Sequence, residues 1–186
     1  MEKSKIFERE ISLIKDKNIQ RICHDYFNHT VPSYFWEVGA SSSGKYHPQF
    51  SQGEGGLVRH TKAVVMFAEE LLKMSQWLYM PEIYKDYVIV ACLVHDTCKY
   101  GCCHYDPSEY KNHAKNAAQQ FDTHWYYANN CQSAPDLLLS AIRSHMGQWT
   151  TEKEHRPFTP IDRCVHMADY MASRSFIDIP QLHDEE

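Results

Sequence analysis

The 186-residue chain has no long hydrophobic segment. None of its apolar runs is long enough to cross a bilayer, and its first residues mix charged and apolar side chains. We therefore expect neither a membrane span nor a signal peptide. The seven cysteines are scattered through helical patterns, and a chain of this size needs no disulfide scaffold. These features favour a reducing, cytoplasmic location.

Positive charge is also scarce in this chain. It has 19 lysines and arginines against 24 aspartates and glutamates, which gives a formal net charge of -5. Tight binding of duplex DNA or RNA depends on a broad basic surface, so this balance argues against it. A phosphate-bearing substrate is still compatible with the charge, because bound divalent cations can invert the field around clustered carboxylates.

The sequence contains no clear alternation of apolar and polar residues of the kind that marks β-strands, and it has no internal repeat or low-complexity tract. Apolar residues instead recur every three to four positions, and the length suits one domain, so we predict a single-domain, all-α bundle. Its expected parts are a helical segment at 1–30, a loop at 31–56, a metal-binding helical core at 57–178 and a frayed tail at 179–186. Helices of the core are expected at 57–74, 81–95, 109–129, 135–147 and 161–171.

An adjacent histidine and aspartate follow the apolar run at 88–94. Imidazole and carboxylate side chains can hold a divalent metal, although a histidine at a helix end can also hydrogen-bond the last carbonyls of that helix. Similar side chains lie on or beside the other helical patterns. The candidate metal ligands are His60, His95, Asp96, His113, His145 and Asp169.

The order histidine, histidine-aspartate, histidine, histidine, aspartate resembles the HD-domain metal-dependent phosphohydrolase superfamily. Residues 45–48 and 55–61 look like the HD domain of the YhaM-type 3'-5' exoribonucleases. Residues 95–99 are similar to the family's His-Asp-x-x-Lys element. Residues 142–147 and 168–174 resemble the segments that carry its later histidine and its terminal aspartate. The resemblance spans most of the chain.

The resemblance implies two metal ions. The first would be held by His60, His95, Asp96 and Asp169. Asp96 could bridge to the second ion, whose other ligands would be His113 and His145. Imidazole and carboxylate ligands suit Mn, Fe, Co, Ni, Zn or, less comfortably, Mg. The alternative for His113 and for His145 is that each caps a helix, or forms a hydrogen bond to a metal ligand without binding the metal itself.

Several cationic side chains are candidates for substrate binding. Lys99 would lie near a metal-bound phosphate and neutralise developing charge, which makes it, with Asp96, a candidate catalytic residue. Its alternative is a solvated lysine at a helix end. Arg174 could bind phosphate or pair with Asp178 at helical spacing. Arg143 and His47 are the other two candidates for substrate binding. The alternative for His47 is an exposed histidine in a loop.

Aromatic side chains offer a further possibility. Trp125, Tyr126, Tyr127 and Trp149 could stack on bases, as in proteins that bind single strands, but core packing or loop anchoring is the more ordinary role.

The resemblance implies a metal-dependent phosphohydrolase. We predict a phosphodiesterase that uses a metal-activated water on a nucleotide-containing substrate, such as a short RNA 3' end or a cyclic nucleotide. Its expected partner is therefore a nucleotide or a short single-stranded nucleic acid. One alternative is a nucleoside-phosphate phosphohydrolase. Another is a non-catalytic HD module that binds a nucleotide without turnover.

Overall fold

The computed structural model describes residues 2–41, 47–150 and 152–183, so Lys45 and Tyr46 of the motif at 45–48 lie outside the described residues. The described elements are helices and loops, which confirms the all-α prediction. The α-helices are α1 (Glu8–Ser12), α2 (Lys17–His29), α3 (Gly56–Leu71), α4 (Glu82–Val94), α5 (His113–Ala128), α6 (Asp136–Ser144) and α7 (Pro160–Ala172). Short 3-10 helices lie at Lys3–Phe7, Ser33–Trp36, Gln49–Ser51, Pro107–Asn112, Gly147–Trp149, Lys153–His155 and Pro180–Leu182.

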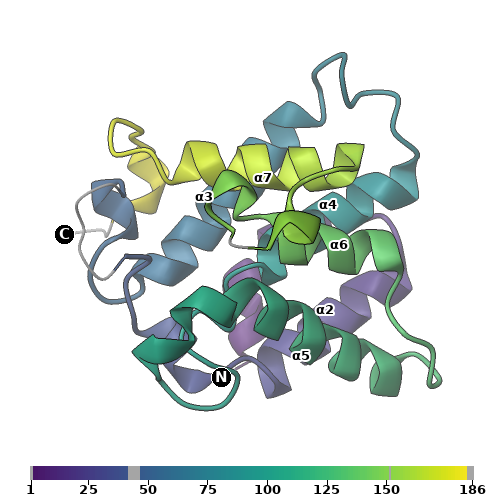
Figure 1. Cartoon of the computed structure of the whole chain (residues 1–186), viewed down its shortest axis with the longest axis horizontal. Helices are drawn as coiled ribbons and strands as arrows, with labels where there is room; N and C mark the ends of the chain where they lie inside the picture. Colours follow the sequence, from purple (N-terminus) through teal and green to yellow (C-terminus); the bar gives the residue numbers. More distant parts are fainter. Residues whose placement is uncertain (1, 42–46, 151, 184–186) are drawn as a thin grey trace.

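Helix α4 is the centre of the bundle. It packs against α3, α6 and α7, while α3 lies along α7 and α5 packs against α6 (Figure 1). All residues from Val88 to Val94 are buried, as expected for a helix that is covered on every side. The C-terminal end of α4, which leads into the histidine-aspartate pair, is therefore in the interior of the fold.

Local sequence explains where α3 and α7, which both pack against α4, begin. Thr159 and Asp162 form a reciprocal capping box at the start of α7, and Pro160 occupies the first turn, where its missing N–H costs nothing. Helix α3 begins after Gly55, which adopts a left-handed φ of 67°. A Cβ on Gly56 would come within 2.4 Å of the Ser51 carbonyl oxygen, so only glycine fits there.

The predicted helix boundaries differ from the structure in detail. The helix expected at 57–74 ends at Leu71, and the one expected at 135–147 ends at Ser144. The loop expected at 31–56 contains two short 3-10 helices. In the described ranges, no helix combines the length and the apolar character that crossing a membrane requires.

The prediction of a frayed tail from residue 179 is wrong for the described part of that tail. Ile179 and Leu182 are each only 8% exposed and belong to the hydrophobic core. Ile179 directly precedes the 3-10 helix Pro180–Leu182, and Leu182 is its last residue, so their spacing of three residues brings both side chains to the same side of this tight turn. Burial of these two side chains offsets the entropy of ordering the segment.

Candidate metal centre

The six candidate ligands come from five helices or helix ends and meet in the interior of the bundle. His60 lies in the second turn of α3, and Asp169 lies near the C-terminal end of α7. His95 and Asp96 directly follow α4, and His145 directly follows α6. The five residues of the set that are fully enclosed are His60, His95, Asp96, His113 and His145.

One group of ligands surrounds the Oδ2 atom of Asp96. The Nε2 atoms of His60 and His95 lie 3.8 and 3.6 Å from it, and 3.4 Å from each other. Asp169 completes this group, because its Oδ1 atom lies 3.2 Å from His60 Nε2 and 3.9 Å from His95 Nε2. These are the four residues that the resemblance assigns to a first ion.

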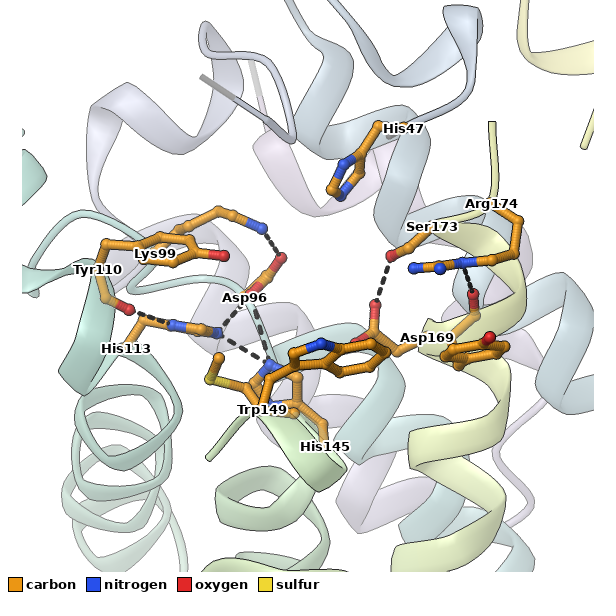
Figure 2. Close-up of a pocket in the computed structure, with 12 residues that line it drawn as sticks. His47, Asp96, Lys99, Tyr110, His113, His145, Trp149, Asp169, Ser173 and Arg174 are labelled. Atoms are coloured by element: carbon orange, nitrogen blue, oxygen red, sulfur yellow. Dashed lines mark hydrogen bonds and ion pairs between the residues drawn. The ribbon is translucent and has the colours of Figure 1, made fainter. Parts of the chain in front are cut away.

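A second group surrounds the other carboxylate oxygen of Asp96. His113 Nε2 lies 3.1 Å from Asp96 Oδ1, and His145 Nε2 lies 3.6 Å from it. The two Nε2 atoms are 2.9 Å apart. The single carboxylate of Asp96 therefore faces two sets of imidazoles, one with each oxygen. Figure 2 shows Asp96 with His113 and His145, the second of these sets.

Hydrogen bonds within the helices fix how three of these imidazole rings are oriented. The Nδ1 atoms of His95, His113 and His145 lie 2.7, 2.6 and 2.8 Å from the backbone carbonyl oxygens three residues earlier. A carbonyl oxygen can only accept, so Nδ1–H donates in each case and the Nε2 lone pair of the neutral ring points into the centre. This is the tautomer that a metal-binding histidine needs.

The donor set fits bound cations. The Nε2 lone pairs of His113 and His145 face each other at 2.9 Å, and both approach Asp96 Oδ1. Among the described residues, Asp96 Oδ1 is buried without a hydrogen-bond partner. Lone pairs that converge without protons repel one another unless a positive ion lies between them. Divalent metals are the ions that such imidazole and carboxylate donors hold.

The electrostatics of the centre maintain the protonation states that a metal requires. Burial, together with the neighbouring His95 and His113, lowers the pKa of His145 to about 3. Burial also lowers the pKa of His95, although Asp96 opposes this. Burial would raise the pKa of Asp96, but Lys99 and the nearby histidines hold it well below its usual range. Neutral imidazoles and an ionised carboxylate are therefore present together at neutral pH.

Lys99 is not a solvated helix-end lysine. It is only 5% exposed, and its ammonium group forms an ion pair with Asp96 Oδ2. Burial would lower its pKa, but Asp96 and the Tyr110 hydroxyl raise it, so the side chain stays charged. The loop that carries it is anchored by Tyr34, whose hydroxyl donates to the Gly101 carbonyl at 2.6 Å and accepts from the Tyr100 N–H at 2.9 Å.

A cavity of about 390 Å³ opens onto the centre. Its volume falls in the range of about 300–1,000 Å³ that is typical of small-molecule sites. Figure 2 shows how the side chains converge on this space. The residues that line it are His47, Asp96, Lys99, Tyr110, His113, His145, Met146, Trp149, Asp169, Tyr170, Ser173 and Arg174.

Three of the four predicted substrate-binding residues, Lys99, Arg174 and His47, line this cavity, and Arg143 does not. His47 is partly buried and packs the edge of its ring near His60, with the ring centroids 5.8 Å apart. Arg174 lines the cavity, while Asp178 pairs with His183 within the described ranges. Arg143 is half-buried and does not line the cavity, and its assignment to substrate binding stays a prediction. It lies two positions before His145, about 200° around a helix, and therefore faces away from the centre.

Several residues at the cavity were missed from the sequence. Ser173 lies one helical turn after Asp169, and its hydroxyl donates to Asp169 Oδ1 at 3.3 Å. Tyr110 stacks on His113, with ring centroids 5.3 Å apart and an interplanar angle of 29°. The spacing of four from Asp169 could have indicated Ser173. Tyr110 carries no such signal, because its role depends on the turn that precedes α5.

His166 supports the centre from behind. Its Nδ1–H donates to the His145 backbone carbonyl at 2.7 Å. The ring lies directly against Gly147, where an added Cβ would come within 2.1 Å of it. Gly147 also adopts a left-handed φ of 60°. The turn that follows the His145 ligand is thus shaped by a glycine and held by a histidine from α7.

The fold and the site together define an all-α protein with a buried histidine-aspartate centre that can hold metal ions. The family model of the HD domain matches residues 57–174, well over half of the chain. The chain therefore belongs to the HD domain family, whose members are metal-dependent phosphohydrolases. All six candidate ligands lie inside the matched residues. No curated protein and no solved structure matches the chain.

Proposed function

We propose that this HD domain hydrolyses phosphodiester bonds in a nucleotide-containing substrate, such as a short RNA 3' end or a cyclic nucleotide. The observation that carries the proposal is the position of Asp96 between two groups of imidazoles, one at each carboxylate oxygen. A shared carboxylate is the arrangement that holds two ions a few ångströms apart. We assign the first ion to His60, His95, Asp96 and Asp169, and the second to Asp96, His113 and His145.

Two bound divalent ions would activate a water molecule and stabilise the charge of an in-line phosphoryl transfer. The chain itself contributes positive charge and orientation. Lys99 places a buried ammonium group at the cavity wall, where it can neutralise charge that develops on a phosphoryl oxygen. Arg174 offers a guanidinium group on the same cavity, which suits a second contact with phosphate. His47 covers the cavity from the loop side.

A phosphodiester is favoured over a phosphomonoester by the second group of ligands. A single ion on the first group would suffice for many nucleotidases of this superfamily, whereas the longer histidine pattern resembles its phosphodiesterases. The Nε2 atoms of His113 and His145 lie 2.9 Å apart, and a bound cation would stabilise two lone pairs that face each other this closely. The resemblance to YhaM-type exoribonucleases points in the same direction and stays a prediction.

The proposed activity is tested by product analysis. The Mn-loaded protein is incubated with short single-stranded RNA, cyclic nucleotides and nucleoside phosphates, and products are identified by chromatography and mass spectrometry. We expect cleavage of internucleotide or cyclic linkages, and its loss in Asp96→Ala excludes a contaminant. Release of terminal phosphate alone would favour nucleoside-phosphate hydrolysis. Binding of nucleotide without multiple turnovers would indicate a binding module instead.

Metal stoichiometry tests the assignment of ligands separately. Elemental analysis of the loaded protein should give about two ions per chain. His113→Ala and His145→Ala should each lose mainly one ion, whereas Asp96→Ala should lose both. His104→Ala is the matched control, because His104 is exposed and does not line the cavity, and it should keep the full content. Unchanged stoichiometry in His113→Ala and His145→Ala would leave a mononuclear centre.

A further inference from the structure

Trp149 is half exposed at the mouth of the cavity, unlike the other tryptophans near the core. It is 50% exposed, whereas Trp77 and Trp125 are 5% and 4% exposed. Trp149 lines the same cavity as Asp96 and His145. A large aromatic surface in contact with water is unfavourable, so its position beside a concave site calls for a ligand that covers it.

The indole ring is held in place before any ligand binds. It stacks on Tyr170 with an interplanar angle of 14° and a distance of 5.7 Å between ring centroids. It belongs to the turn Gly147–Trp149, which begins two residues after the candidate ligand His145. The hydrogen bond from His166 to the His145 carbonyl fixes the start of this turn. A ring that is already oriented loses little side-chain entropy on binding, which favours its use as a stacking surface.

A cation lies next to this aromatic pair. The guanidinium carbon of Arg174 is 4.3 Å from the centroid of the Tyr170 ring and 5.8 Å from that of Trp149. Its Nε–H donates to the Tyr170 carbonyl at 3.1 Å. In the part of the chain that the structure describes, that is the only hydrogen bond of the Arg174 side chain, so its terminal nitrogens remain for a ligand on the cavity side. Figure 2 shows Arg174 and Trp149 on the side of the cavity where Asp169 lies.

We propose that Trp149 and Arg174 form a subsite for a nucleobase and its neighbouring phosphate, next to the metal centre. The proposal rests on the proposed function, because it assumes that the phosphate to be cleaved lies at Asp96. An aromatic plane with an adjacent guanidinium group matches a nucleotide, whose base stacks while its phosphate pairs with the cation. Base stacking tolerates any base, so the subsite selects nucleotides without selecting a sequence. The preferred substrate is then single-stranded, because a base within a duplex is already stacked on its neighbours.

The proposal is tested with a dinucleotide and its analogue in which both bases are removed. Base–aromatic stacking is worth enough that Trp149→Ala should raise KM for the dinucleotide about tenfold or more. The value of kcat should change little, since Trp149 is not among the proposed metal ligands. The same variant should hydrolyse the abasic analogue like the unmodified protein. Trp149→Phe keeps a stacking surface and should restore most of the lost affinity.

The matched control is Tyr79→Ala, which removes an aromatic side chain that is 87% exposed and does not line the cavity. It should leave KM for both substrates unchanged. Equal KM values for Trp149→Ala and the unmodified protein on the dinucleotide would overturn the stacking subsite while the proposed function stands. Equal KM values of the unmodified protein for the dinucleotide and its abasic analogue would do the same.

A binding measurement separates this proposal from the activity itself. If neither substrate is cleaved, the proposed function fails, and titration of the Mn-loaded protein with adenosine monophosphate still decides the subsite. Stacking on Trp149 should quench tryptophan fluorescence in the unmodified protein and markedly less in Trp149→Phe. Quenching of equal size in both proteins would overturn the subsite.

Discussion

Replacing Gly147 with alanine isolates the contact that supports the second group of ligands. The added Cβ would lie 2.1 Å from His166 Cε1, which is far inside van der Waals contact. The His166 ring must therefore move, and its hydrogen bond to the His145 carbonyl is lost. The loss of that bond costs about 0.5–1.5 kcal/mol, and the left-handed φ of a non-glycine residue costs about 1–2 kcal/mol. We expect Gly147→Ala to lower the free energy of unfolding by about 2–3 kcal/mol.

Gly53 provides a matched control for the backbone part of this cost. It has a φ of 67°, close to the 60° of Gly147, but a Cβ there would meet no atom within 4 Å. Gly53→Ala should therefore lower the free energy of unfolding only by the backbone strain, about 1–2 kcal/mol. Both alanines reduce the entropy of the unfolded chain by the same amount, so this effect cancels in the comparison. The difference between the two variants measures the collision with His166.

The assay is urea unfolding of the metal-free proteins, followed by circular dichroism. A second background, His166→Ala, provides the decisive step, because the ring that collides is then absent. In that background Gly147→Ala should cost no more than Gly53→Ala. If Gly147→Ala costs the same with and without His166, the turn is constrained by something other than this ring and the reasoning is refuted.

Three further predictions concern Lys99, His145 and Tyr34. Lys99→Met should lower kcat by about 100-fold or more while elemental analysis finds the metal content unchanged, because it removes charge and no proposed ligand; a large loss of metal would contradict this role. His145 has its pKa lowered from 6.5 to about 3 in the fold, so its neutral form is favoured there, and the metal-free protein should lose stability as pH falls below about 6.5. Urea unfolding should show that the free energy of unfolding falls by up to about 2 kcal/mol between pH 7.5 and 5.0, and by less in His145→Gln. Tyr34→Phe removes the hydroxyl that pairs with the buried Gly101 carbonyl and the Tyr100 N–H. Thermal unfolding should show a free energy of unfolding that is lower by about 1–3 kcal/mol.

Sequence patterns indicated which candidate ligands would lie together better than how they are arranged. His95 and Asp96 could be singled out because an apolar helix ends directly before them, and the spacing of the other candidates matched a known order of side chains. Which oxygen of Asp96 serves which group depends on how α3, α5, α6 and α7 pack around α4, and no local pattern encodes this packing. The prediction therefore reached the residues of the centre and stopped short of its geometry.

The roles that the sequence left open, and the residues that it missed, depend on the tertiary structure. The sequence left two roles for Lys99, because a lysine after a helix is usually solvated. In the structure Lys99 lies three residues after Asp96, and the turn between them brings its ammonium group to the Asp96 carboxylate. Arg143 was grouped with the substrate-binding residues as a cation near His145, but the helical rotation between the two positions leaves it outside the cavity lining. Tyr110 could be placed only by the tertiary structure, which sets its ring against His113.

The convergence of α3, α4, α5, α6 and α7 on one point has a consequence for the dynamics of the domain. Between His60 and Asp169 the chain leaves this point and returns to it several times, so ions bound there would close a series of loops as cross-links do. A helix that moved away from the bundle would carry a ligand with it. Release of metal and local opening of the helices would then be the same event, and free metal concentration would set how often any of these segments is open to proteases or to hydrogen exchange.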